Sequence, residues 1–450
     1  MSKLYEKIIK RGVERGLSEV EVYVVERSKR SFMVLGEKIS EAVYRESIHI
    51  GVRGALGKRV SGVYINTIQF SVDEILNKLL SAIKSTPEDP YWSGFPPLIG
   101  TLRSVKTFDE KIITMSEEEY IELLKYTMEK FKQPALARGV EKAIITEGGL
   151  EAEKTRVTVM NSQGVERTVD LSNLHVGFSL SIEKSGLQAD KSVFYSKSIL
   201  NERELEEVLL EEGERALLFL GSKPIESGIY DVILEPLVTG AILTYSLAEA
   251  FSALEIIEGR SPLRGKEGNS VFSDKITIID DPYLEGALGT RPFDDEGVTT
   301  SSKPVVEKGV FKNTLHSYYT ARRMASTPTG NGFRRSPAAQ PTPKFTNLVL
   351  KPGSGSLEEF TRDLRRGLVV YEIIGYWMSD YTTGNVKATV THGLLVENGV
   401  ITRPVKGVVL GGNIYEWISR NIIEVGEDVK VVGDMATPSL WISNVRIGGE

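Results

Sequence analysis

The sequence contains no cysteine and only four histidines among 450 residues. The absence of cysteine excludes disulfides, thiolate metal ligands and a cysteine nucleophile. The histidines are His49, His175, His316 and His392, and no two are close enough in sequence to form a His-x3-His metal motif. Serine hydrolase chemistry is also disfavoured, because no Gly-x-Ser-x-Gly elbow occurs. His316 and His392 could each orient a hydroxyl, but isolated histidines are more often structural.

Long apolar runs and an excess of positive charge are also missing. No stretch reaches about 18 apolar residues without a charged residue, so we expect no membrane contact. Residues 1–19 are charged and amphipathic, with no apolar core of a signal peptide. We therefore expect a cytoplasmic protein. Lys and Arg total 55 against 61 Asp and Glu, a net charge of −6, which disfavours nucleic acid as the main partner.

What is present predicts an α+β protein with more than one domain. Hydrophobic residues make up 41% of the chain, enough for ordinary cores. At about 150 residues per domain, two or three units are expected. The patterns predict an N-terminal α+β layer with a proline-rich linker at 1–105, a second α+β layer at 106–222 and a larger β-rich C-terminal domain at 223–450.

The two N-terminal units show the same pattern of helix, strands and helix. In the first, helices at 4–15 and 73–85 flank several short strands with glycine or serine breaks. The second has helices at 116–133 and 201–218, and Ser116 with Glu119 fits a capping box at the start of the former. Between them, the segment Asn-Ser-Gln-Gly at 161–164 is typical of a hairpin turn.

The third unit is predicted to begin with a strand and one long helix, from about Thr239 to Glu258. Leu243, Leu247 and Phe251 lie along one face of that helix. On the pattern alone, this is a core helix with solvated glutamates. Strands and glycine-rich turns dominate the rest of the unit. Two further helices are predicted there, at about 357–367 and 413–421.

Two polar segments could carry chemistry. Asp294, Asp295 and Glu296 are consecutive carboxylates that could bind a hard cation, or equally cap a turn and contact Arg291. Residues 327–335 form a polar glycine loop that could cradle an anion, or equally a flexible surface loop. The loop lacks the nucleotide-binding P-loop pattern.

We name three candidate contacts for a peptide or an anion. They are Asn331, Arg334 and His392.

The order of several motifs resembles the TldD/PmbA family, whose older name is "modulator of DNA gyrase". Each motif is weak alone, but their order and spacing are fairly specific. The similarity covers nearly the whole chain and is strongest after about residue 225. The segments that carry it are NSQG at 161–164, PFDDEGV at 292–298, LHSYYTARRM at 315–324, the Thr-Gly-Asn loop at 329–331, GLLVENGVITRPVKGVVLGGN at 393–413, VGED at 425–428 and TPSLWISNVRIGG at 437–449.

The resemblance implies a peptidase system of two paralogous chains. TldD-type chains carry His-Glu-x-x-x-His on a helix and a Cys near the C-terminus, which hold zinc. PmbA-type chains, also called TldE, keep the fold and lose the ligands. Here Ala248 and Ala253 stand at the histidine positions, so only Glu249 survives from the motif. Residues 433–439 replace the Cys-bearing segment.

The resemblance therefore predicts a non-catalytic, PmbA/TldE-like subunit with no cofactor of its own. Zinc is expected only in a TldD-like partner, with which the chain would form a heterodimer acting on peptides or unfolded segments. A peptide would be held as an added strand at a sheet edge. One alternative is a homodimeric peptide-binding module without a catalytic partner. The other, disfavoured by the acidic charge balance, is direct action on gyrase or DNA.

Overall fold

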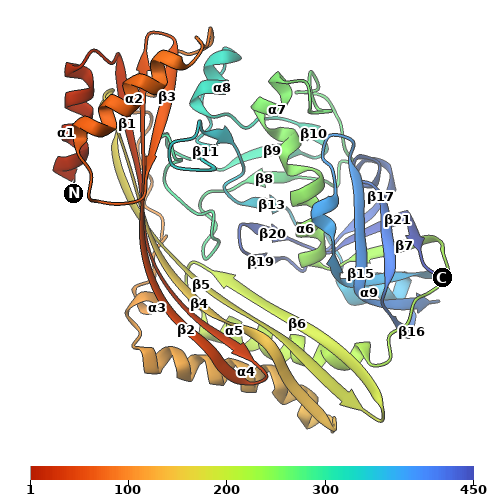
Figure 1. Ribbon diagram of the computed structural model, residues 1–450. Helices are drawn as coiled ribbons and strands as arrows, with labels where there is room; N and C mark the ends of the chain where they lie inside the picture. Colours follow the sequence, from red (N-terminus) through yellow and green to blue (C-terminus); the bar gives the residue numbers. More distant parts are fainter. Residues whose placement is uncertain (1) are drawn as a thin grey trace.

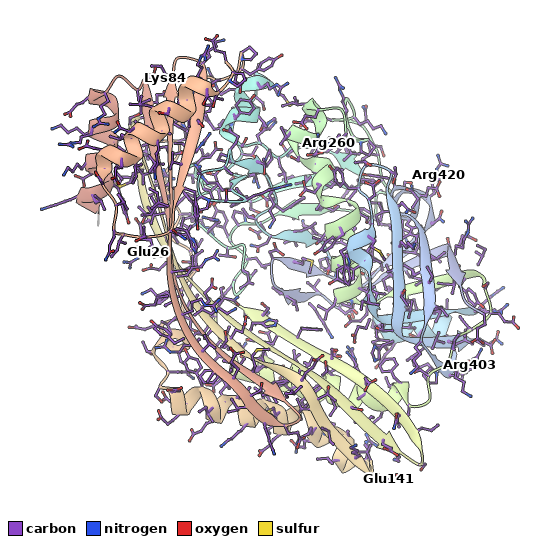
Figure 2. All side chains as sticks on the ribbon, in the orientation of Figure 1. Glu26, Lys84, Glu141, Arg260, Arg403 and Arg420 are labelled. Atoms are coloured by element: carbon purple, nitrogen blue, oxygen red, sulfur yellow. The ribbon has the colours of Figure 1, made fainter. Side chains whose placement is uncertain are left out.

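The N-terminal half is built around one long, twisted antiparallel sheet. The computed structural model describes residues 2–450. The sheet has the strand order β3-β2-β1-β4-β5-β6 and runs the length of the molecule in Figure 1. In Figure 2, Glu26 lies near its middle and Glu141 at its far end. Its strands are β1 (Glu19–Leu35), β2 (Lys38–Leu56), β3 (Arg59–Ile65), β4 (Lys142–Asn161), β5 (Glu166–Lys184) and β6 (Leu187–Lys197).

Helices cover this sheet at two places. Two pack near its upper end in Figure 1, and the others near its lower end. The upper pair is α1 (Ser2–Glu14) and α2 (Val72–Ser85); the lower set is α3 (Glu110–Thr114), α4 (Glu117–Ala137), α5 (Glu202–Arg215) and the 3₁₀ turn η1 (Ala216–Phe219). The capping box at Ser116 is confirmed, because Ser116 and Glu119 bond each other's backbone N–H groups.

The strands differ from the short ones predicted for the first unit. β1 and β2 are 17 and 19 residues long, and β1 pairs with β4 from the second unit along most of its length. The serine break predicted near Ser28 does not occur, because Arg27–Arg30 continue the sheet on a half-exposed face. Strands from both sides of residue 105 thus share one sheet, and the domain boundaries stay predictions.

The C-terminal region has two sheets. In the larger one, β14, β7, β21, β17 and β15 follow one another, and β15 pairs back to β14, so the strands close into a ring. Its members are β7 (Gly228–Leu234), β14 (Arg366–Ile374), β15 (Asn385–Glu397), β16 (Val400–Val405), β17 (Val408–Asn413), β18 (Ile422–Val425) and β21 (Leu440–Gly448).

The smaller sheet has short strands in the order β10-β9-β8-β13-β20-β19. They are β8 (Ile278–Asp280), β9 (Lys303–Glu307), β10 (Val310–Phe311), β13 (Leu348–Leu350), β19 (Lys430–Val432) and β20 (Met435–Thr437), beside a ribbon of β11 (Gly332–Phe333) and β12 (Thr342–Pro343). Helices and turns of this region are α6 (Pro236–Ser246), η2 (Ala248–Phe251), α7 (Ala253–Ile257), α8 (Tyr318–Arg323), α9 (Leu357–Asp363), η3 (Tyr376–Met378), α10 (Ile414–Glu416) and a π-helical turn, Trp417–Asn421.

The helix predicted over 239–258 is three short pieces. Leu247 leaves the helical backbone region at φ −138° and ψ −43°, and Ser252 is extended at φ −71° and ψ 126°. The extended stretch pairs with the chain at Leu315, which accepts from the N–H of Ala253 and donates to the carbonyl of Phe251. This long-range pairing breaks the helix where its side-chain pattern continues.

The halves are joined by a shared hydrophobic core. Side chains of α4, α5 and β6 pack in one cluster with Ile233, Val369 and Leu394 of the C-terminal ring. The predicted mixed α+β class with a β-rich C-terminal region is confirmed. Among residues 2–450, no helix has the length and apolar character that crossing a membrane requires.

Candidate functional site

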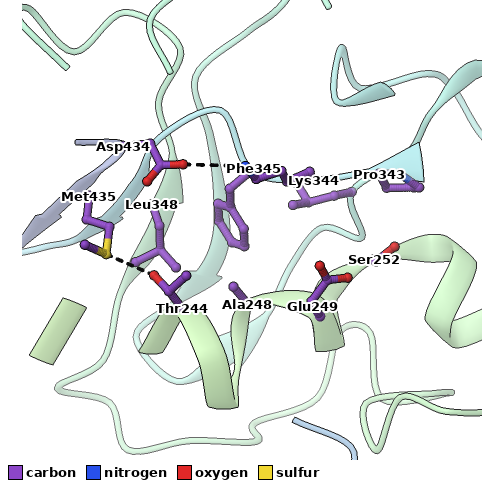
Figure 3. Close-up of a pocket in the computed structure, with 11 residues that line it drawn as sticks. Thr244, Ala248, Glu249, Ser252, Pro343, Lys344, Phe345, Leu348, Asp434 and Met435 are labelled. Carbon is purple, nitrogen blue, oxygen red and sulfur yellow. Dashed lines mark hydrogen bonds and ion pairs between the residues drawn. The ribbon is translucent and has the colours of Figure 1, made fainter. Parts of the chain in front are cut away.

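A small cavity lies where α6 gives way to η2. Its volume is about 70 Å³, and Figure 3 shows its walls. One wall comes from α6 and the pieces after it, the second from the loop before β13, and the third from the turn between β19 and β20. The lining residues are Thr244, Ala248, Glu249, Ser252, Leu315, Pro343, Lys344, Phe345, Leu348, Asp434 and Met435.

This cavity brings together the two segments singled out by the family resemblance. Ala248 and Glu249 come from the degenerate helix motif, and Asp434 and Met435 from the segment that replaces the Cys-bearing one. These positions are about 185 residues apart in sequence. Ala253, at the second histidine position, is fully buried and does not line the cavity.

Glu249 is one of three ionisable side chains that line the cavity, with Lys344 and Asp434. It is exposed to solvent, and no hydrogen bond from the described residues reaches its carboxylate. Desolvation by the surrounding walls raises its pKa, and the negative charge of Glu255 adds to this. Arg335 and Lys344 oppose the shift without reversing it.

The donors around the cavity do not fit a zinc ion. Its two carboxylates are Glu249 and Asp434, and the latter lies 3.6 Å from the Lys344 ammonium. The Met435 thioether accepts from the Thr244 hydroxyl at 3.0 Å. Catalytic zinc sites use three imidazole, thiolate or carboxylate ligands and leave one position open. Among residues 2–450, no group of three such side chains comes together.

Asn331 is fully buried and bonds the backbone of Lys344, a residue that lines this cavity. Its side-chain amide donates to Asp280 at 2.8 Å and to the Lys344 carbonyl at 2.9 Å, and its oxygen accepts from Thr329 at 2.7 Å. The Lys344 N–H in turn donates to the Asn331 carbonyl. Asn331 therefore fixes the backbone of a cavity wall, and all its side-chain donors and acceptors are directed into the protein.

Arg334 lies in a buried ion cluster between the two halves. Its guanidinium donates to Glu21 of β1 at 2.6 Å, and both side chains are 1% exposed. Its backbone N–H donates to Asp295 at 2.8 Å. Arg53 contacts the same Glu21 carboxylate at 3.2 Å. The cluster ties the C-terminal loop to the long sheet.

The acidic triplet 294–296 holds turns together. Asp294 accepts from the backbone N–H groups of Glu296, Val298 and Gly332. Asp295 pairs with Arg291 at 2.9 Å, and the Tyr318 N–H donates to Glu296 at 2.6 Å. Of the two interpretations of the triplet, the structure shows the turn-capping one.

His392, the third candidate contact, lies away from the small cavity. Its Nδ1 is 3.2 Å from the Glu372 carboxylate, and its Nε2 bonds the Asp190 carbonyl of β6. Burial lowers its pKa, although Glu372 opposes this. Asn331, Arg334 and His392 therefore do not converge on one site.

A larger cavity beside His392 was not foreseen from the sequence. It has a volume of about 500 Å³ and lies between β6 and α5 on one side and α6, β14 and β19 on the other. Its ionic groups include Lys191, Glu212, Arg215, Glu235 and Lys430. These residues come from β6, α5, the N-terminal cap of α6 and β19, so no spacing in the sequence signals that they meet.

Comparison with known proteins identifies the family. The family described as the PmbA/TldA metallopeptidase C-terminal domain matches residues 227–449. An uncharacterized protein of Methanocaldococcus jannaschii is 30% identical over 439 residues, which cover 97% of each chain. The chain belongs to the PmbA/TldD family. The resemblance predicted from its motifs is confirmed.

Other relatives in the PmbA/TldD family carry more specific names. A metalloprotease of Methanothermobacter thermautotrophicus is 33% identical over 264 residues, so the chain spans 57% of that relative's length. TldE from Thermococcus kodakarensis has the same fold, with a TM-score of 0.88, 24% identity and 99% coverage of both chains. A Thermotoga maritima protein described as a modulator of a DNA gyrase also matches, with a TM-score of 0.88 and 23% identity.

Proposed function

We propose that this chain is a non-catalytic subunit of a PmbA/TldD-type metallopeptidase acting on peptides or unfolded segments in the cytoplasm. Its partner would be a TldD-like chain that holds the zinc. The observation that carries the proposal is the composition of the small cavity. Ala248 and Met435 line it beside Glu249, where metal chemistry would need imidazole or thiolate donors. The chain would complete the peptide chamber and stabilise the zinc-bearing partner.

Pairing is the first thing to test. The chain is expected to form a heterodimer when mixed with a TldD-like chain from the same organism, with a mass measured by light scattering near the sum of the two. Cleavage of an unfolded protein substrate should then rise with added chain until the ratio is one to one. A homodimer that ignores the TldD-like chain would contradict the proposal and favour a free-standing peptide-binding module.

The role of Glu249 provides a second test. In a non-catalytic subunit, Glu249→Gln should leave the cleavage rate of the mixed complex within about twofold, since one proton-transfer group contributes about 10²–10⁴-fold when it acts in catalysis. The matched variant is the Glu→Gln change in the motif of the TldD-like chain, which should abolish cleavage. A loss of more than a hundredfold from Glu249→Gln would place chemistry in this chain.

The gyrase alternative has little physical support. It rests on the older name of the family and on the description of the Thermotoga maritima protein, which is 23% identical to this chain. The net charge of −6 provides no excess of cations for phosphate contacts. Binding to duplex DNA at 50 mM salt with a steep salt dependence would favour that alternative.

A further inference from the structure

The 500 Å³ cavity between the long sheet and the C-terminal region has an apolar wall over a charged floor. The wall contains aromatic and aliphatic side chains from five elements: Phe194, Val208, Leu237, Ile373, Tyr376 and Trp377. A cavity of this size that combines an apolar wall with convergent polar groups is typical of a binding site for a small ligand or a side chain.

The charged floor is internally paired. Lys191 lies 2.8 Å from Glu212 and 3.3 Å from Glu372. Arg215 and Lys430 each contact Glu235, at 3.2 and 3.0 Å. Each of these three cations has at least two carboxylate partners. An ionic ligand would have to displace one of these buried partners, which is costly. The floor therefore favours an uncharged ligand.

The rim of the cavity exposes large apolar side chains to solvent. Phe194, Ile374 and Trp377 are 49%, 51% and 54% exposed. Phe194 comes from β6, and Ile374 and Trp377 come from the end of β14 and the turn η3, so two segments about 180 residues apart in sequence meet here. Clustered apolar exposure on a folded protein marks a surface that another apolar group covers.

The edge of β6 beside this rim has one open backbone position. The carbonyls of Asp190, Ser192 and Ser196 accept from His392, from the Lys191 ammonium and from the Gly433 N–H. In an antiparallel strand, alternate residues direct both backbone groups to the same side. Phe194 belongs to this outward set. Within residues 2–450, no group bonds its carbonyl or N–H from that side.

We propose that this cavity binds an extended, uncharged peptide segment. One apolar side chain of the peptide enters the cavity, and the backbone of that same peptide residue exchanges hydrogen bonds with the backbone of Phe194. The ligand class rests on the proposed function, in which peptides are the substrate. The blocked carbonyls on either side limit the pairing to one residue. The apolar wall provides the affinity, and the paired floor rejects Lys, Arg, Asp and Glu side chains.

The cavity and the small pocket at Glu249 share one face of α6. Leu237 and Ala241 line the larger cavity, and Thr244 and Ala248 line the smaller one. The spacing of four and three residues from Leu237 to Ala241 and Thr244 follows one side of α6, and Ala248 comes after the break at Leu247. Ala241 and Thr244 are separated by about 4.5 Å of helix rise. An extended chain covers that in about two residues, so a peptide anchored in the cavity reaches the pocket.

The probe is an end-capped pentapeptide, acetyl-Ser-Ala-Phe-Ala-Ser-amide, added to the full chain alone. Trp377 lines the cavity, so binding should give a saturable blue shift of tryptophan fluorescence, and calorimetry provides the dissociation constant. The same peptide with Lys in place of Phe should bind at least tenfold more weakly. A peptide N-methylated at the Phe nitrogen tests the backbone bond to Phe194 and should also bind more weakly.

Two variants locate the binding. Ile374→Asp places a charge at the rim and should weaken binding of the Phe peptide about tenfold, the effect of losing one partly buried apolar contact. The matched control is Ile401→Asp, a similarly exposed isoleucine on β16 outside the cavity, which should leave binding unchanged. Ala241→Phe fills the cavity from α6 and should abolish binding. Thermal unfolding confirms that each variant is folded.

The inference is overturned if the Phe peptide shows no saturable binding at millimolar concentration, if the Lys peptide binds equally well, or if both Asp variants weaken binding alike. These outcomes are separate from the proposed function. A chain that binds the Phe peptide but fails to pair with a TldD-like chain refutes the proposed function and supports the cavity. If the chain pairs with a TldD-like chain and activates cleavage but does not bind the peptide, only the proposed peptide binding in the cavity is refuted.

Discussion

Replacing Arg334 should destabilise the protein and leave ligand binding unaffected. The Arg334 guanidinium joins Glu21 at 2.6 Å across the contact between the two halves, with both side chains 1% exposed. Arg334→Met keeps most of the side-chain length and removes the charge and its hydrogen bonds. Breaking a buried pair costs about 3–5 kcal/mol. Because Glu21 keeps its contact with Arg53 at 3.2 Å, we expect the lower end, about 3 kcal/mol.

Calorimetry measures this effect directly. For a chain of 450 residues that unfolds in one transition, about 3 kcal/mol corresponds to a fall in Tm of about 3 °C. The exposed neighbour provides the control, since Arg335→Met should shift Tm by less than about 1 °C. If Arg334→Met keeps the wild-type Tm but loses affinity for peptides or anions, Arg334 is a ligand contact and the structural role is wrong.

Three further perturbations follow from buried groups. Burial, together with the nearby Asp294 charge, raises the pKa of Glu296, so the folded state keeps a proton that the unfolded chain releases above about pH 4.5. The stability of the wild type therefore falls as the pH rises from 4.5. Because Gln has no proton to lose, the Tm of Glu296→Gln should rise relative to that of the wild type between pH 5 and pH 8. Burial raises the pKa of Glu212, but Lys191 and its neighbours outweigh this and lower it to about 2, so the stability it contributes is lost as pH falls from 4.5 toward 2. In denaturant unfolding, Lys191→Met should therefore reduce the free energy of unfolding at pH 7 by about 3 kcal/mol. The variant should also lose less stability than the wild type as the pH falls from 4.5 toward 2. Phe251→Ala removes a fully buried ring and should cost about 3–5 kcal/mol by the same assay.

The fold could be predicted from the sequence where the signal is local. The capping box at Ser116 and the hairpin turn at 161–164 depend on residues a few positions apart, and both occur as predicted. The strand lengths and the helix breaks depend on distant partners. β1 continues through its polar stretch because β2 and β4 flank it, and the chain opens at Ser252 because it pairs with Leu315.

The candidate site shows the same division. The motif resemblance identified Glu249 and the segment 433–439, and the structure brings them to one cavity. Asn331 and Arg334 were chosen for their chemistry in a glycine loop. Only the structure shows that Asn331 bonds Asp280 and Arg334 bonds Glu21, partners 51 and 313 residues away. The larger cavity has no sequence signal, since its floor assembles from ion pairs between distant elements.

The central claim is that this chain lacks the metal chemistry of its relatives, and zinc content with cleavage by the isolated chain tests it most directly. After incubation with zinc and removal of excess metal, elemental analysis should find well below 0.1 zinc per chain. An unfolded protein substrate should remain intact until a TldD-like chain is added. One tightly bound zinc per chain, together with cleavage that a chelator abolishes, would contradict the account.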